Sequence, residues 1–339
     1  MTGYTIDSVF NRNGYDECID FIKGWCILCV VLNHCIEHMK EILFPIWGSP
    51  AVALFILIQV FHTYKKNQQK VEVNIRSIWR RILKPFLFVQ CMLIPLWLLC
   101  YDMPLLEQLK LIIYKGGKGP GTYYVWVYIQ IAFLLPLLNS FLQKSRKHMF
   151  FFIFVCISQF SEMLFCISSC PDYVYVLLFP RYIFLIYLGY QIATKPFTIS
   201  PITLSLSLLS LLSLIFFSYC NIPLAPYFYN HPNFSTCHWP SYYYVSLLLI
   251  FILRYLYRQI QNKNKIMTTI LCQMGKQSYN IFLLQMFYFS VLDIFPIRNW
   301  FIVITEEWIR EIVFGLFSAA ICVCPILVYS NYKTSKNEK

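Results

Sequence analysis

The sequence predicts an all-α polytopic membrane protein with about ten transmembrane helices and both termini in the cytoplasm. Of its 339 residues, 58% are hydrophobic and 13% are charged, and the mean hydropathy is +0.56. Apolar runs recur at the length that crosses a bilayer, which a soluble domain does not need. Basic residues gather in every second loop, as expected for loops on the cytoplasmic side.

Ten segments are long and apolar enough to span the membrane. They are residues 19–38, 46–63, 83–101, 123–142, 149–168, 175–193, 202–221, 241–257, 269–292 and 309–330. This arrangement places roughly three in four of the 28 Lys and Arg residues on the inner side. We expect one membrane domain over residues 15–332, with short polar cytoplasmic tails at 1–14 and 333–339 and no cleavable signal peptide. The net charge of +12 reflects this topology, and we expect no nucleic-acid partner.

Charged residues interrupt the first predicted span. Lys23 and His34 are eleven positions apart, so they share one helix face and lie roughly 16 Å apart along the axis. Asp20 lies near the same face, and buried ionisable groups in a membrane usually face a protein interior or a wet cavity. Two interpretations are open. Lys23 extends to the interface and pairs with Asp20 while His34 is structural, or these residues perform chemistry.

The segment Asp20-Phe-Ile-Lys23-Gly24, followed by an apolar run and Asn33-His34, resembles the opening signature of the acyltransferase family 3 membrane proteins. The family usually has arginine where this chain has Lys23, which keeps the charge but loses the two-pronged grip on phosphate. Further resemblances follow in the family's order, and they extend to about residue 330. They lie at residues 53–59, 81–86, 123–126, 181–190 and 275–285, with Gln285 where histidine is common.

The resemblance implies a membrane O-acyltransferase. It would move an acyl group, acetyl first of all, from acetyl-CoA or another acyl-CoA to a sugar hydroxyl of a surface or exported glycan. Transfer to a hydroxyl needs a base near neutrality, for which His34 is the candidate, either as general base or as acyl carrier. Asp20 would position Lys23, and Glu37 or His38 would assist His34. Expected partners are the glycan acceptor, the acyl-CoA donor and membrane lipids in a plasma membrane, here the bacterial inner membrane. No metal is expected.

A basic segment at the inner mouth of the predicted bundle ends in Arg80, Arg81 and Lys84. With Lys23, these residues are candidates to bind the phosphates of the donor. The same charges also serve as an ordinary inner-loop topology signal. Arg81 fits one of the two arginines of the family's second basic motif, and Arg76, Arg80 and Lys84 stay open for the other.

Weaker candidates lie toward the predicted outer side. Tyr124 and Trp126 belong to an aromatic helix start that resembles a family motif, and Glu162 is expected to pair with Arg181, more as a structural than as a catalytic pair. The glycine-rich residues 115–121 favour a structural turn over a substrate loop. The fourteen cysteines form no clear framework, and disulfide pairing is open for those near the outer side: Cys166, Cys170, Cys220 and Cys237.

The alternative function is a transporter or flippase for a lipid-linked glycan or a small anion. Such proteins typically show inverted repeats and broken helices in matching halves. The sequence shows neither feature, and its charges are concentrated in the first span and one basic segment. This concentration favours a fixed active site.

Overall fold

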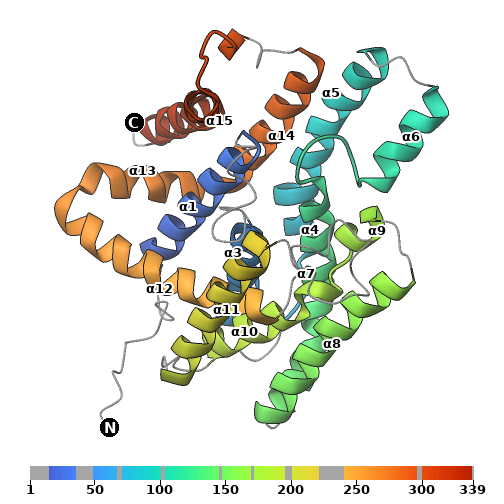
Figure 1. The fold of residues 1–339 in the computed structure, drawn as a ribbon, viewed down its shortest axis with the longest axis vertical. Coiled ribbons are helices and arrows are strands. Elements are labelled where there is room, and N and C mark those ends of the chain that lie inside the picture. The colour runs from blue at the N-terminus through green and yellow to red at the C-terminus, as the bar shows by residue number, and fades with distance from the viewer. Residues whose placement is uncertain are drawn as a thin grey trace.

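The computed structural model describes residues 15–35, 49–66, 71–100, 104–144, 147–168, 172–194, 201–220, 240–295 and 300–337. Within these ranges nearly all residues are helical and none is in a strand (Figure 1). The longer helices are α1 (Glu17–Asn33), α3 (Ser49–Lys66), α5 (Lys84–Cys100), α6 (Leu105–Tyr114), α7 (Thr122–Lys144), α8 (Lys147–Ile167), α10 (Ile183–Thr194), α11 (Pro201–Cys220), α12 (Pro240–Lys263), α13 (Lys265–Lys276), α14 (Ser278–Ile294) and α15 (Glu307–Asn337). Short elements are α4 (Ile75–Ile78), η2 (Trp79–Leu83), α9 (Asp172–Leu177) and η3 (Pro180–Tyr182).

Three helical runs among the described residues have the length and apolar composition of a membrane span. They are Ile75–Cys100, Thr122–Gln143 and Glu307–Tyr332. The all-α membrane architecture predicted from the sequence is therefore confirmed. The number of ten spans and the cytoplasmic position of both termini stay predictions.

The span predicted at 83–101 begins earlier in the structure, and its basic residues lie within a helix instead of a loop. The side chain of Asn74 caps the helix by accepting a hydrogen bond from Ser77 N at 2.8 Å. Residues Trp79–Leu83 form a π-helical turn, closed by the N–H of Lys84 donating to the carbonyl of Trp79. Such wide turns are rare and frequently mark functional sites.

The predicted span 269–292 is two helices, because the backbone leaves helical geometry at Gln277 (φ −102°, ψ 11°). α13 begins at the cap Asn264, whose side chain accepts from Met267 N, and α13 packs across α1 (Figure 1). The first span is shorter than predicted: α1 ends at Asn33, and His34 is its C-cap. A hydropathy window averages over many residues, so the few polar residues at these helix ends, among them His34 and Gln277, do not mark a break.

Two glycines allow the close crossing of α1 and α13. A Cβ added to Gly24 would overlap the backbone carbonyl oxygen of Leu271, and one added to Gly275 would overlap the carbonyl oxygen of Asp20. Both glycines belong to the segments that resemble family motifs, which lie 250 residues apart. The crossing therefore brings the first and the last of these segments into backbone contact.

The glycine-rich turn between α6 and α7 is held against the helices around it. Its glycines have φ values of 71°, 133°, 108° and 79° at 116, 117, 119 and 121, a region that side chains rarely adopt. Gln90 on α5 donates to Lys118 O at 2.9 Å and accepts from Lys118 N at 2.6 Å. Trp126 on α7 donates to Gly116 O at 2.6 Å. These contacts support the favoured interpretation of a structural turn.

Candidate functional site

The N-terminal half of α1 carries a buried polar cluster around Asp20. Asp20 is 4% exposed, and its carboxylate pairs with Lys23 Nζ at 2.5 Å and accepts a hydrogen bond from Tyr15 Oη. Burial, together with the Asp20 carboxylate, raises the pKa of the Tyr15 phenol. The ion pair expected from the i, i+3 spacing is present, and Lys23 keeps one-fifth of its side chain exposed.

Other elements surround this cluster. Lys276 of α13 lies with Nζ 5.3 Å from the ring centroid of Tyr15. Tyr257 of α12 donates to Glu17 at 3.3 Å. His62 of α3 lies close enough to Lys23 and Asp20 to interact with them electrostatically. The cluster is therefore assembled from four helices and the residues before α1.

His34 lies at the opposite end of α1 from this cluster. Its backbone N–H caps the helix by donating to the carbonyl of Val31 at 3.2 Å. Its ring is partly buried and lies 5.4 Å, centroid to centroid, from the ring of Phe289 on α14. Eleven helical steps separate Lys23 from His34, so the predicted separation of roughly 16 Å holds along α1.

The basic candidates lie on and beside the π turn. Arg80, Arg81 and Lys84 are exposed, and Arg81 is within electrostatic range of Tyr128 on α7. Tyr279 of α14 donates to the backbone carbonyl of Ile82 at 2.7 Å. This bond ties the π turn to α14, so the basic side chains project from a fixed segment.

Tyr124 and Trp126 lie on different sides of α7. The ring of Tyr124 packs against Phe55 of α3 and Phe282 of α14, at 6.1 and 5.8 Å between centroids. Trp126 instead packs edge-on against Phe86 of α5 at 6.1 Å. Only Tyr124 thus points toward helices that contact α1.

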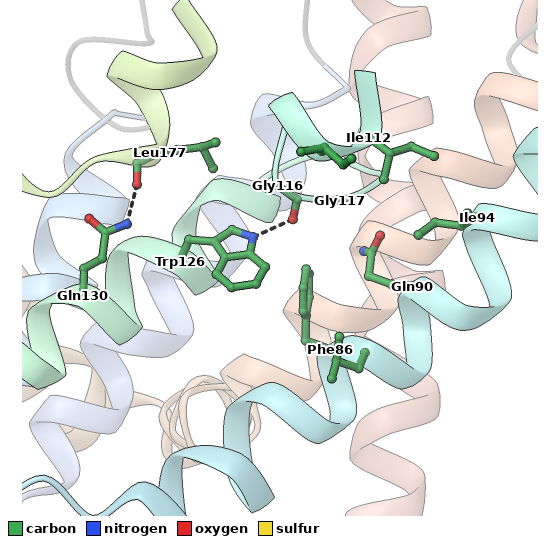
Figure 2. Close-up of a pocket in the computed structure, with 11 residues that line it drawn as sticks. Phe86, Gln90, Ile94, Ile112, Gly116, Gly117, Trp126, Gln130 and Leu177 are labelled. Carbon is green, nitrogen blue, oxygen red and sulfur yellow. Dashed lines mark hydrogen bonds between the residues drawn. The ribbon is translucent and has the colours of Figure 1, made fainter. Parts of the chain in front are cut away.

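Trp126 lines a pocket of about 460 Å³ (Figure 2). The pocket lies between α5, the glycine turn, α7 and α9. Its amide side chains are already engaged: Gln90 with Lys118, and Gln130 with Leu177 O at 2.8 Å. The pocket is therefore an apolar space without a free polar anchor among its described lining residues.

Lys118 belongs to the glycine turn and follows the pocket-lining residue Gly117. Its Nζ lies 4.6 Å from the ring centroid of Trp97 and 3.7 Å from Asp293. Burial lowers the pKa of Lys118, and the Asp293 carboxylate opposes this shift. Both contacts hold the turn in place.

Arg181 is 4% exposed and is enclosed by aromatic rings. Its guanidinium lies 4.6 Å from the Tyr182 ring, 4.9 Å from Tyr175 and 5.6 Å from Tyr123. It also donates to Val176 O at 3.2 Å. These contacts are of the kind expected for a structural arginine.

Several predicted residues fall outside the described part of the chain. Glu37 and His38 lie there entirely, as do Cys170 and Cys237, and the side chains of Glu162, Cys166 and Cys220 are likewise not described. Among the described residues, Cys26 and Cys29 are buried and free. No group of three or more His, Cys, Asp or Glu in the described ranges could hold a metal ion.

The comparisons with known proteins identify the family. The model of the acyltransferase 3 family, described as an acyltransferase domain, matches residues 16–329. The chain belongs to this family. The family, together with the apolar helices, makes the protein a membrane acyltransferase. A search of the curated proteins and a search of the solved structures find no match.

Sequence reasoning missed three residues of this acyltransferase that contact the predicted candidates or the π turn. Tyr15 and His62 approach Asp20 and Lys23 from outside α1, and Tyr279 anchors the π turn. Gln285 on α14, which the sequence singled out only as the position where the family commonly has histidine, is fully buried, and neither polar atom of its side chain has a partner among the described residues.

Proposed function

We propose that this membrane acyltransferase is an O-acyltransferase of the plasma membrane with a multi-pass topology. It moves an acyl group, acetyl in the first instance, from acyl-CoA to a sugar hydroxyl of a surface or exported polysaccharide. The observation that carries the proposal is the pairing of a fixed cation at one end of α1 with a histidine at the other, within a chain of this family.

His34 is suited to the proton transfer in this reaction. An alcohol becomes a good nucleophile when a base takes its proton, and imidazole has a free pKa near neutrality. The ring lies at the helix end, partly buried against Phe289. The hydroxyl of the acceptor approaches from that end, attacks the thioester carbonyl, and gives its proton to His34 as CoA thiolate leaves.

The donor's phosphates are assigned to the opposite end of α1. Lys23 is held there by Asp20, and the exposed Arg80 and Arg81 project from the anchored π turn. Charged nitrogen donors bind phosphate oxygens strongly. The pantetheine arm of the donor then extends along the face of α1 that Lys23 and His34 share.

The test is acyl transfer from labelled acetyl-CoA in detergent-solubilised protein, with a crude surface-glycan fraction as acceptor. The variants are His34→Ala and Lys23→Ala, with Lys263→Ala, an exposed lysine at the end of α12, as control. We expect label on glycan with the wild type and the control. Removing the base should lower the rate by about 10²-fold or more.

A His34→Ala protein that retains full transfer contradicts the assigned base. If the wild type neither binds CoA nor transfers label to any fraction, the donor assignment is wrong and the transporter or flippase alternative is favoured. Detergent separates the two classes, because no transport across a membrane can occur there.

A further inference from the structure

Gln285 is a buried polar group that the protein itself does not satisfy. Its side chain has no exposed surface, and neither Nε2 nor Oε1 has a hydrogen-bond partner among the described residues. A buried amide without partners destabilises a protein substantially, so such groups are rare unless something else binds them. Gln285 therefore points to a ligand or a water molecule.

The position of Gln285 follows from the contacts at both ends of α1 and α14. At one end, Asp20 meets Gly275 just before α14; at the other, His34 meets Phe289. The two helices thus run in the same direction. Gln285 is one turn before Phe289 and nearly on the same face, which places it roughly 6 Å from the His34 level toward Lys23.

The interface between α1 and α14 is smaller than the interface between α1 and α13. α1 packs most extensively on α13, through the two glycines, and much less on α14. On the other flank of Gln285, Tyr288 is engaged with Ser318 of α15 at 3.1 Å between oxygens. The amide of Gln285 therefore lies on α14 between the face toward α1 and the Tyr288–Ser318 contact.

We infer that the side-chain amide of Gln285 binds the pantetheine arm of the acyl donor, at the amide nearest to the thioester. This inference rests on the proposed function and assigns it a further binding residue. That arm amide can donate and accept hydrogen bonds, as the Gln285 amide requires. Its nitrogen is four single bonds from the thioester carbon, or roughly 5 to 6 Å when extended, given bonds near 1.5 Å and longer ones to sulfur.

These two lengths agree. With the thioester at His34, the first arm amide falls one helical turn closer to Lys23, which is the level of Gln285. An apolar side chain at this position would leave the arm amide without a partner in a dry interface. Gln285 would thus hold the arm in the register that presents the thioester carbonyl beneath His34.

The experiment compares two probes that differ by the arm alone. CoA carries the pantetheine arm, and adenosine 3′-phosphate 5′-diphosphate (3′-phospho-ADP) is the nucleotide end without it. Equilibrium binding of both is measured on solubilised full-length protein for the wild type and for Gln285→Leu. The control is Ser290→Ala, which removes another fully buried, unpartnered polar atom of α14 that faces the glycine turn at Gly119.

We expect Gln285→Leu to weaken CoA binding about tenfold, the equivalent of one lost hydrogen bond. Its affinity for 3′-phospho-ADP should stay within about twofold of wild type, as should both affinities of Ser290→Ala. If Gln285→Leu keeps wild-type CoA affinity, the amide holds a water molecule and the inference is wrong. If both probes weaken equally, the effect is structural and the inference is also wrong. Absence of CoA binding by the wild type overturns the proposed function, and the inference with it.

Discussion

The close crossing of α1 and α13 makes a specific prediction for Gly24. In the variant Gly24→Ala, the added methyl group meets the carbonyl oxygen of Leu271, a backbone atom that cannot move without shifting α13. The same holds for Gly275→Ala, whose methyl group meets the carbonyl of Asp20. Both helices must therefore separate to accommodate either methyl group.

The expected size of the effect follows from two opposing contributions. Alanine is favoured over glycine in a helix interior by about 1 kcal/mol. Forcing an extra methyl group into a packed interface opposes this by about 1–3 kcal/mol, and the upper end applies here because the obstacle is backbone. The net destabilisation is about 2 kcal/mol, or a fall of roughly 4 °C in the unfolding midpoint at about 2 °C per kcal/mol.

Gly315 supplies the matched control, because it is also a helical glycine facing α1. A methyl group at Gly315 would lie 3.3 Å from Leu32 Cδ2, the end of a flexible side chain, and 3.7 Å from Cys35 Cβ, an ordinary van der Waals contact. Gly315→Ala is therefore expected to be neutral or to stabilise by up to about 1 kcal/mol. The contrast between the variants, more than either value alone, tests the crossing.

The assay is thermal unfolding in detergent, followed with a dye that reacts with newly exposed thiols. Cys26 of α1 and Cys272 of α13 are buried and become reactive as the two helices part. If Gly24→Ala unfolds at the same temperature as Gly315→Ala, the two helices do not approach as closely as argued. In that case the two family motifs would not be in backbone contact.

Three further predictions concern the glycine turn, the ion pair of α1 and the basic residues of the π turn. Gln90→Leu leaves a backbone N–H and a carbonyl of the glycine turn without partners, and we expect a loss of about 2 kcal/mol, measured by the same unfolding assay. Lys23→Met leaves the buried Asp20 carboxylate without its cation and should lower the free energy of unfolding by about 2 kcal/mol. This loss is smaller than the loss from breaking a fully buried pair, because Lys23 is partly exposed. The double variant Asp20→Asn/Lys23→Met should recover most of this loss. If the double variant is as unstable as Lys23→Met alone, the ion pair does not account for the loss. Arg81→Ala should raise the KM for acyl-CoA about tenfold. Arg76→Ala, one turn outside the π segment, should leave this KM unchanged. If both variants raise the KM equally, the effect comes from the net positive charge of the segment and not from Arg81.

The sequence predicted those features that depend only on residues close together in the chain. The apolar runs predicted helical spans because hydropathy and length are properties of a continuous segment. The Asp20–Lys23 pair was predictable because i, i+3 spacing fixes which side chains meet on a helix. The His34 position on the same face followed from the helical repeat. These features needed no tertiary contact.

The features that the sequence did not predict depend on distant partners. The π turn at Trp79–Leu83 is stabilised by Tyr279, almost two hundred residues away. The break at Gln277 lets α13 cross α1, which hydropathy does not distinguish from a continuous span. His62 approaches Asp20 and Lys23 only through the packing of α3 against α1, whereas Tyr15 lies five residues before Asp20 in the chain. Sequence periodicity contains no information on such contacts.

The crossing also suggests why the cation of α1 is placed so firmly. Gly24 follows Lys23 directly, so the same turn of α1 that carries the ion pair is the turn that α13 touches. α13 then brings Lys276 over Tyr15, whose hydroxyl donates to Asp20. The contact between α1 and α13 therefore fixes both the packing of this turn of α1 and the position of its charged side chains. For this reason Gly24→Ala should raise the KM for acyl-CoA in addition to lowering stability, while Gly315→Ala should change neither, and a Gly24→Ala protein with lower stability but an unchanged KM would separate the packing from the donor site.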